Sequence, residues 1–316
     1  MFGELSCPVK HNGKYTFLDT KCRLVKNISF NYIKESAFSD GYCSFINIVK
    51  KNGKRKWVDG YIDRKGKIIY LIGYDEVNAF KEGMSKVRRN NLYGFIDLNM
   101  KESIECKYEE ASSFSEGLSC VCKDGKYGYI DRNENIIIDF KYSLAEKFSC
   151  ERALVEIGND RFFIDRNEKR VFGLEYGMYT SNFFEDDIIR VWDKSFKYGY
   201  LDKDGKIISS CKYERANNFS EGYASVRVDG KWGFINKNDK FVISPKYDYA
   251  SSFKGGLSMV AIKDDFGLNR WGYINKDGVE VIPVIYESCE SFEGEYAQVS
   301  KYGDYFYIDK NGYRVF

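Results

Sequence analysis

Apolar and polar residues alternate over short stretches of the chain, which is typical of β-strands with one buried face. Residues 118–123 show this alternation, and Asp124-Gly125 follows, a dipeptide suited to the positive φ angles of a two-residue hairpin turn. A second apolar stretch covers residues 126–131 and a third covers 135–138. The pattern therefore predicts a three-stranded antiparallel meander.

The same meander recurs along the whole sequence. Its central strand has the form aromatic-Gly-aromatic-Ile-Asp, and the spacing between successive copies is near 34 residues. Nine versions end at Asp19, Asp63, Asp97, Asp131, Asp165, Asp202, Asn236, Asn275 and Asp309. We therefore predict an all-β fold of about nine tandem three-stranded units.

A connector of the form Lys-Tyr-x-x-Ala-x-x-Phe-Ser-Glu-Gly joins the units, as at residues 107–117 and 212–222. Tyr108, Ala111 and Phe114 are three residues apart, which predicts a single 3₁₀ or α turn with this apolar edge on the core.

The ends of the chain coincide with the ends of predicted units. A ring closed by a strand lent from one terminus would begin in the middle of a unit, so we predict an open solenoid or superhelical array. A closed, propeller-like ring is the alternative. In either case residues 1–316 form a single repeat array, with cap units at residues 1–24 and 300–316.

The central strands resemble those of the bacterial WG-containing (KWG) repeat family. Residues 231–237 read Lys-Trp-Gly-Phe-Ile-Asn-Lys, residues 270–278 are similar, and residues 126–131 and 197–202 carry Tyr in place of Trp. The resemblance implies a β-rich repeat array that is used for binding and has no established catalytic residues. Three units depart from the pattern where glycine is expected, at Thr16, Phe162 and Phe306.

Composition supports this prediction and narrows the chemistry. Aromatic residues make up 17% of the chain, with 28 Gly and only 3 Pro, which favours strands and tight turns. Nine cysteines without a CxxC pair, and one histidine, predict no metal site and no cofactor. We expect reduced thiols in a cytoplasmic protein. No apolar run reaches the roughly 18 residues of a membrane helix, so no membrane association is expected.

The repeated motif residues are interpreted as structural. An Asp or Asn at a strand end accepts hydrogen bonds from backbone N–H groups of the following turn. The glycine between the aromatic residues lacks a Cβ, so we expect a large ring of a neighbouring strand to lie over it.

A basic patch is predicted at the N-terminal hairpin turns. Residues 1–100 hold 18 basic and 10 acidic residues, and the turns of successive units are expected to lie on one edge. Such a patch would bind nucleic acid or another polyanion through phosphate contacts, or would only keep the hairpins soluble. The residues are Lys50, Lys51, Lys54, Arg55, Lys56, Arg88 and Arg89.

Departures from the repeat also suggest protein contacts. Residues 263–269 lengthen one hairpin and place Phe266 and Leu268 between acidic residues, and Trp57 and Trp192 lie outside the regular aromatic positions. Exposed residues of these types mark protein contacts or sugar platforms.

Three functions follow from these features. The first is a non-catalytic protein–protein interaction module, not an enzyme. The second is a protein that binds nucleic acid or another polyanion through the basic hairpin edge. The third is a protein that binds or degrades carbohydrate.

Overall fold

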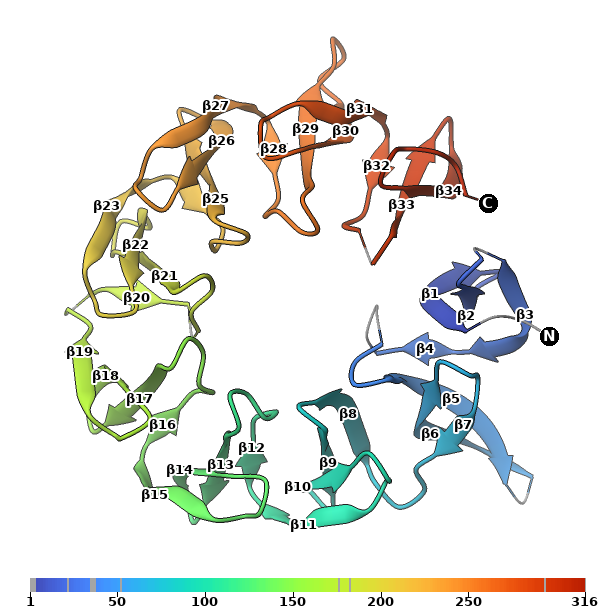
Figure 1. Cartoon of the computed structure of the whole chain (residues 1–316), viewed down its shortest axis with the longest axis vertical. Coiled ribbons are helices and arrows are strands. Elements are labelled where there is room, and N and C mark those ends of the chain that lie inside the picture. Colours follow the sequence, from blue (N-terminus) through green and yellow to red (C-terminus); the bar gives the residue numbers. More distant parts are fainter. Residues whose placement is uncertain are drawn as a thin grey trace. The chain divides into compact units, whose positions relative to one another are not determined.

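The computed structural model describes residues 4–21, 23–34, 38–51, 53–175, 177–181, 183–292 and 294–315, with only the backbone of residue 51. Over these residues the strands form nine antiparallel sheets that follow one another in sequence, and no helix is present (Figure 1). The chain divides into two compact units, Met1–Phe148 with Val155–Asp160 and Ser149–Leu154 with Arg161–Phe316.

The first three sheets contain β1 (Leu5–His11), β2 (Lys14–Asp19), β3 (Leu24–Phe30); β4 (Tyr32–Ile33), β5 (Tyr42–Lys51), β6 (Lys54–Asp63), β7 (Ile68–Tyr70); β8 (Glu76–Lys81), β9 (Met84–Arg89), β10 (Leu92–Asp97) and β11 (Glu102–Tyr108). The next three contain β12 (Glu110–Ala111), β13 (Ser119–Lys123), β14 (Lys126–Ile130), β15 (Ile136–Tyr142); β16 (Leu144–Ala145), β17 (Ala153–Ile157), β18 (Asp160–Ile164), β19 (Arg170–Gly173); β20 (Tyr179–Thr180), β21 (Ile188–Trp192), β22 (Tyr198–Asp202) and β23 (Ile207–Tyr213). The last three contain β24 (Arg215–Ala216), β25 (Tyr223–Val228), β26 (Lys231–Asn236), β27 (Phe241–Tyr247); β28 (Tyr249–Ala250), β29 (Ser258–Lys263), β30 (Asn269–Ile274), β31 (Glu280–Tyr286); β32 (Ser288–Cys289), β33 (Tyr296–Lys301) and β34 (Asp304–Asp309).

Seven of these described sheets have four strands in consecutive order, and the first and last have three. A four-stranded antiparallel meander repeated along a chain is the blade of a β-propeller. The fold class is therefore a nine-bladed β-propeller, and the predicted open solenoid of three-stranded units was wrong. We number the sheets as blades 1 to 9 in chain order.

The wrong prediction came from the connector. It contains no helical turn: its residues Glu110 and Ala111 form a short strand that pairs with Cys122 and Val121 as the first strand of blade 4. Each connector thus supplies a fourth strand to the sheet that follows it. The boundary between two successive blades therefore lies inside the connector. For this reason, the agreement of the chain ends with the predicted repeats gave no argument against a propeller.

The connector then reverses in a tight turn. Glu116 and Gly117 have φ angles of 55° and 81°, and Ser115 and Leu118 exchange backbone hydrogen bonds across them. These positive φ angles at both central residues define the turn type that suits a hairpin.

Buried side chains of consecutive blades form a shared core. In the first unit, Phe95 and Ile104 of blade 3 pack with Phe114 and Val121 of blade 4. In the second unit, Phe234 of blade 7 packs with residues of blade 8, such as Phe253 and Val260, in the same way. Within each unit these blades therefore bury their apolar faces against one another.

In most repeated strands that have the glycine, the space beside it is filled by backbone of the neighbouring strand and not by the predicted aromatic ring. A Cβ on Gly128 would lie 2.7 Å from the carbonyl oxygen of Ile138, and one on Gly233 would lie 2.6 Å from that of Ile243. The pairing of β15, the last strand of blade 4, is bulged at this point, since its register to β14 shifts between Tyr127 and Tyr129. In blade 2 a ring does approach as well: Phe45 Cζ would be 2.7 Å from a Cβ on Gly60.

The departure at Phe162 has a local compensation. Phe162 pairs with Gly173 of β19, so in blade 5 the glycine is on the partner strand. A small residue is thus present in this strand pair on the partner strand, although a Cβ on Gly173 would meet the Arg170 side chain and no backbone atom closer than 3.8 Å.

The predicted turn-capping role of the strand-end residues is confirmed. Asp131 Oδ1 accepts hydrogen bonds from the backbone N–H groups of Asn133 (2.9 Å) and Asn135 (2.8 Å). Asn236 Oδ1 accepts those of Asn238 and Lys240 in the same pattern.

Carboxylates of the connector turns join consecutive blades. Glu221 of blade 7 accepts hydrogen bonds from Gly255 N (2.6 Å) and Gly256 N (3.0 Å) of blade 8, and its Oε2 lies 3.0 Å from Lys276 Nζ. Partial burial alone would raise the pKa of Glu221, but these contacts together lower it below the ordinary value. In the first unit Glu82 accepts N–H groups of Glu116 and Gly117 in the same way.

The described residues include no helix that is long and apolar enough to cross a membrane.

Candidate functional site

A hollow of about 350 Å³ lies in the first unit, where blades 2 and 3 meet. Three aromatic residues line it: Tyr32 of β4, Trp57 of β6, and Tyr74, which precedes β8. The Tyr32 and Trp57 rings are 5.8 Å apart at 44°, and 56% and 52% of these two residues are exposed. Blade 2 therefore presents an aromatic pair to solvent at the rim of the hollow.

The hollow exists because one repeat position has changed. Asp59 stands directly before Gly60, where most units carry an aromatic residue, as Tyr127 does before Gly128. A short carboxylate fills much less space than a ring, so the edge between the blades is left open. Trp57 is two residues earlier and lies on the same face of the strand as Asp59, beside the opened space.

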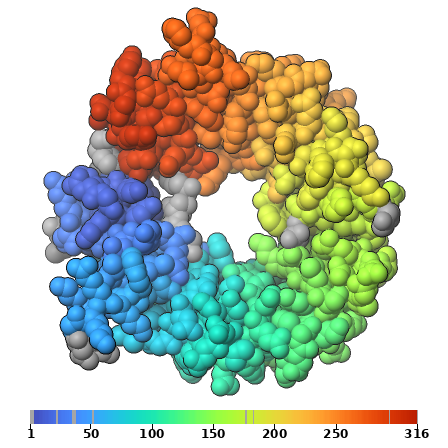
Figure 2. Space-filling view, turned by 180° about the vertical axis from the view of Figure 1, so that it is seen from behind, coloured from blue at the N-terminus to red at the C-terminus, as the bar shows by residue number. Residues whose placement is uncertain are grey.

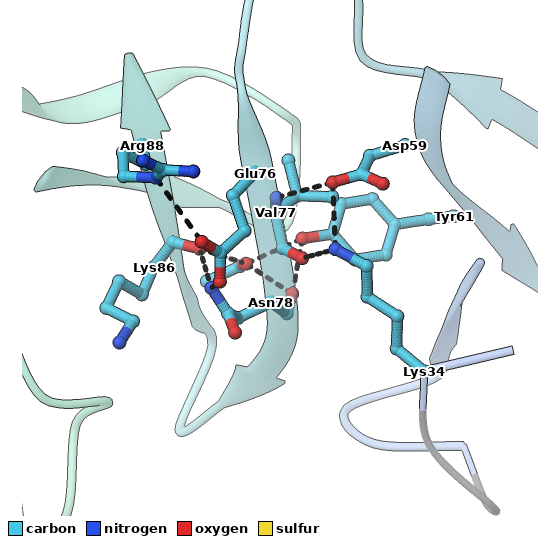
Figure 3. A network of polar contacts seen from close by, with 9 residues as sticks. Lys34, Asp59, Tyr61, Glu76, Val77, Asn78, Lys86 and Arg88 are labelled. Carbon is cyan, nitrogen blue, oxygen red and sulfur yellow. Dashed lines mark hydrogen bonds and ion pairs between the residues drawn. The ribbon is translucent and has the colours of Figure 1, made fainter. Parts of the chain in front are cut away.

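Asp59 is held in place by both blades. Its Oδ2 atom lies 2.8 Å from Lys34 Nζ and accepts a hydrogen bond from Val77 N at 2.9 Å, while Lys34 Nζ also donates to Val77 O at 2.6 Å (Figure 3). The side chains of Lys34 and Asp59 are only 19% and 10% exposed. This largely buried pair is tied to the backbone of Val77 and fixes the floor of the hollow.

A second ion pair lies at its side. Arg88 Nε is 3.3 Å from Glu76 Oε2, and Asn78 Nδ2 donates to the other carboxylate oxygen of Glu76 at 3.2 Å (Figure 3). Arg88 Nη1 also donates to Asn91 Oδ1 at 3.1 Å. The guanidinium and the carboxylate are therefore both engaged within blade 3.

Tyr74 is fixed by a third charged pair. Its hydroxyl donates to Glu102 Oε2 at 2.8 Å, and the Arg89 guanidinium lies 4.6 Å from the ring centroid while Nη2 contacts the same carboxylate at 2.6 Å. Burial, followed by the hydrogen bond to Glu102, raises the pKa of Tyr74 to about 12. Tyr74 is thus a neutral hydrogen-bond donor with a rigidly held ring.

Asp75 is the remaining charged residue of the hollow. It is exposed, and its Oδ2 accepts a hydrogen bond from Asn90 N at 2.8 Å. No basic side chain of the described residues forms an ion pair with it. The lining thus contains two engaged cations and three carboxylates, of which the Asp75 carboxylate lacks a cationic partner.

The predicted basic residues fall into two groups with different surroundings. Lys50, Lys54, Arg55 and Lys56 are exposed on the long β5–β6 hairpin, where Lys50 pairs with Arg55 in the strand register. The side chain of Lys51 lies outside the described residues. Arg88 and Arg89 are instead bound to Glu76 and Glu102 of their own blade.

Phe266 and Leu268 are exposed as the sequence predicts, by 88% and 58%. Asp264 Oδ1 accepts the backbone N–H groups of both residues at 3.0 Å, which holds the turn in one shape. The β29–β30 hairpin that carries them stands out from the surface as an orange projection in Figure 2.

Trp192 has a different environment. Its ring lies between those of Tyr179, at 6.1 Å and 16°, and Tyr198, at 5.9 Å and 39°. It therefore packs within blade 6.

Sequence reasoning missed Tyr32, Lys34, Asp59, Tyr74 and Asp75. One signal was present: Asp59 replaces the aromatic residue before the glycine, a departure as clear as the three glycine replacements. The other four residues gave no signal, because their meeting depends on the short first strand and on the contact between blades.

Comparisons with known proteins agree with this architecture. Six segments match the family model described as "WG containing repeat", at residues 60–93, 93–127, 127–159, 198–232, 232–264 and 271–305. Together they cover more than half of the chain. No curated protein matches the sequence.

Among solved structures, one described as a crystal structure of the eukaryotic initiation factor is similar over 99% of this chain and 90% of its own, with a TM-score of 0.57 and 11% identity. Hsv2 of Kluyveromyces lactis matches over 85% of this chain and 94% of its own, with a TM-score of 0.43 and 10% identity. The β-propeller domain of the Trilobed protease from Pyrococcus furiosus covers 79% of this chain and 96% of its own, with a TM-score of 0.43 and 13% identity. The first similarity shows that a single fold class extends over nearly the whole chain and overturns the open solenoid.

Proposed function

Because the chain belongs to the WG-containing repeat family, we propose that it is a non-catalytic module that binds a partner protein at the hollow between blades 2 and 3. The observation that carries this proposal is the exposed pair of Tyr32 and Trp57 at its rim. Tryptophan and tyrosine are the residues that most often dominate the energy of protein interfaces.

The charged groups of the hollow support recognition rather than reaction. Lys34, Asp59, Glu76 and Arg88 each have a fixed partner of opposite charge, so their positions are set before a ligand arrives. Preorganised polar groups beside exposed rings reduce the entropy lost on binding.

Affinity capture from an extract of the native host tests the proposal. We expect the full chain to retain one protein, and Trp57→Ala to lower the captured amount by about tenfold or more. Phe266→Ala is the matched control, because Phe266 is also an exposed aromatic residue but lies in the second unit. Loss with Phe266→Ala and not with Trp57→Ala would place the contact at the hairpin instead, and capture that neither change affects would contradict the proposal. A partner lost after glycosidase treatment would indicate carbohydrate recognition.

Polyanion binding is a second candidate, favoured by one observation. Lys50, Lys54, Arg55 and Lys56 are exposed together on paired strands and form no ion pair with any described residue. Duplex DNA titrated at increasing salt tests it. Neutralising Lys54, Arg55 and Lys56 to Gln should reduce the slope of log K against log salt by about 3.

The double variant Arg88→Gln/Arg89→Gln is the control for that titration, because both guanidinium groups are already bound to carboxylates. We expect its salt slope to match that of the unchanged chain. Binding of DNA that is absent or insensitive to salt would rule this candidate out.

A further inference from the structure

The hollow between blades 2 and 3 has a chemical preference that its charges and rings define. We infer that it receives one basic side chain, a guanidinium or alkylammonium group, of the partner protein. This inference rests on the proposed function and names the group that the partner inserts.

The first argument is the charge of the lining. The two cations, Lys34 and Arg88, are engaged by Asp59 and Glu76, whereas Asp75 has no cationic partner among the described residues. An incoming anion would meet an excess of negative charge and no available cation. An incoming cation would supply the missing counter-charge to Asp75.

The second argument is the aromatic surface. Tyr32, Trp57 and Tyr74 all line the hollow, and a cation is attracted to the face of such rings, most strongly to that of tryptophan. The chain already shows this chemistry at Tyr74, where Arg89 lies over the ring and pairs with Glu102. A second basic group placed between rings and Asp75 would repeat an arrangement that the chain uses within its own structure.

The third argument is size. A volume of about 350 Å³ is at the lower end of what small-ligand sites enclose, so it accommodates a single side chain rather than a folded segment. The backbone that carries the basic group would lie outside, against the exposed faces of Tyr32 and Trp57. The inserted residue would thus act as the anchor of a larger contact.

The chain contains four tryptophans, which makes a direct test possible. In the ¹⁵N-labelled full chain each indole N–H gives one NMR signal, and Trp57→Phe identifies that of Trp57. The probes are acetyl-Gly-Gly-Xaa-Gly-Gly-amide peptides with arginine, lysine, citrulline or glutamate at the centre. Citrulline is the neutral counterpart of arginine with almost the same shape.

We expect the arginine and lysine peptides to shift the Trp57 signal with saturation in the millimolar range, and the citrulline and glutamate peptides to bind at least fivefold more weakly. Asp75→Asn should weaken the arginine peptide by about fivefold while leaving citrulline binding unchanged. This substitution keeps an oxygen for the Asn90 N–H, so the fold should be preserved. Phe266→Ala should change neither value.

Equal binding of the arginine, citrulline and glutamate peptides would overturn the inference, as would an arginine affinity unaffected by Asp75→Asn, or no shift of the Trp57 signal at all. The outcome is separable from that of the capture experiment. Capture that depends on Trp57 together with no preference for basic peptides would keep the proposed function and remove the basic anchor. Selective arginine binding without a captured protein would support the preference of the hollow for a basic group and contradict the proposed binding of a partner protein.

Discussion

Two edges of the repeat, one between blades 2 and 3 and one between blades 7 and 8, have the same strand arrangement. Equivalent positions hold charged side chains at the first edge and aromatic side chains at the second. In the second unit Trp232, before Gly233, contacts Tyr249 with their rings 6.3 Å apart. In the first unit the same two positions hold Asp59 and Glu76, whose ion pairs line a hollow. One edge is closed by rings and the other is open and charged, so the repeat provides a frame in which a few positions can specialise.

The largest expected effect is at the glycine of the repeated strand, where substitution tests whether the two edges have the same close backbone approach. A Cβ added at Gly233 would lie 2.6 Å from the Ile243 carbonyl oxygen, and one at Gly60 would contact that of Ile69 even more closely. Because backbone must move in both cases, we expect Gly60→Ala and Gly233→Ala each to lower the free energy of unfolding by about 3 kcal/mol. Urea unfolding measures this.

Gly230→Ala is the control for these two variants. A Cβ there has open space except for Arg227 Nη2 at 3.8 Å, so only the φ of +76° is unfavourable. We expect a loss of about 1 kcal/mol. A loss at Gly60 no larger than at Gly230 would show that the two blades do not share the close backbone approach.

The next prediction converts one edge into the other. Trp232→Asp should cost about 3 kcal/mol, because a packed ring is lost and a carboxylate is left without a partner. Asn217 occupies in blade 7 the position that Lys34 holds in blade 2, since each follows the short first strand. Adding Asn217→Lys should therefore recover about 1 kcal/mol.

A double-mutant cycle by chemical denaturation measures that coupling. Asn217→Lys alone is the necessary control, because it removes the hydrogen bond from Asn217 Nδ2 to Ser225 Oγ. Additive effects of the two substitutions would show that the introduced lysine and carboxylate do not form an ion pair. The pair in blade 2 would then depend on further residues of that blade.

The strands, hairpin turns and repeat length were predictable because they depend on residues close in sequence. Asp124-Gly125 specifies its turn locally, and Asp131 caps a turn with N–H groups two and four residues away. Glu110 and Ala111 were not predictable as a strand, since two residues carry no periodicity and become a strand only by pairing with β13. The class of array depends on that fourth strand, so it was assigned wrongly.

The candidate site was predictable only in part. Trp57 stood out as an aromatic residue outside the pattern, and the structure places it at the hollow. The ion pairs of Arg88 and Arg89 could not be predicted from sequence, because their partners Glu76 and Glu102 lie on other strands of the blade. Only the sheet order brings these charges together.

A smaller effect is expected from a tyrosine hydroxyl at the edge between blades 2 and 3 and from its counterpart between blades 6 and 7. Tyr200 OH donates to Asn217 O and Tyr61 OH donates to Asn78 O, each at 2.6 Å, joining each strand to the blade that follows. Removing the hydroxyl leaves the part-buried Asn217 carbonyl without this donor, so Tyr200→Phe should cost about 1 kcal/mol. Tyr61→Phe should cost less, because Ser85 Oγ still donates to Asn78 O at 2.6 Å.

The control for this pair is Tyr198→Phe, because the Tyr198 hydroxyl has no hydrogen-bond partner among the described residues. Thermal unfolding of the three variants is sufficient. A cost at Tyr198 equal to that at Tyr200 would show that the hydroxyls do not carry the contact between blades.

The smallest effect concerns the carboxylate that joins blades 7 and 8. The pKa of Glu221 is lowered in the folded chain by Lys276 and the Gly255 and Gly256 N–H groups, which outweigh the effect of partial burial. A folded pKa below the unfolded one means that Glu221 stabilises the fold above the unfolded value of about 4.5. This contribution is lost as the pH falls through the folded pKa.

We therefore expect the melting temperature to fall on acidification below about pH 4.5, and Glu221→Gln to lose less over the same range. At neutral pH the substitution should cost less than about 1 kcal/mol, because the ion pair is partly exposed and its charge is screened by solvent. Calorimetry between pH 3 and 7 measures both. Glu295→Gln is the matched control, since Glu295 pairs with Lys310 but accepts no backbone N–H group among the contacts of the described residues. An acid slope reduced equally by the two substitutions would show that the lysine, and not the turn of the next blade, accounts for the pH dependence.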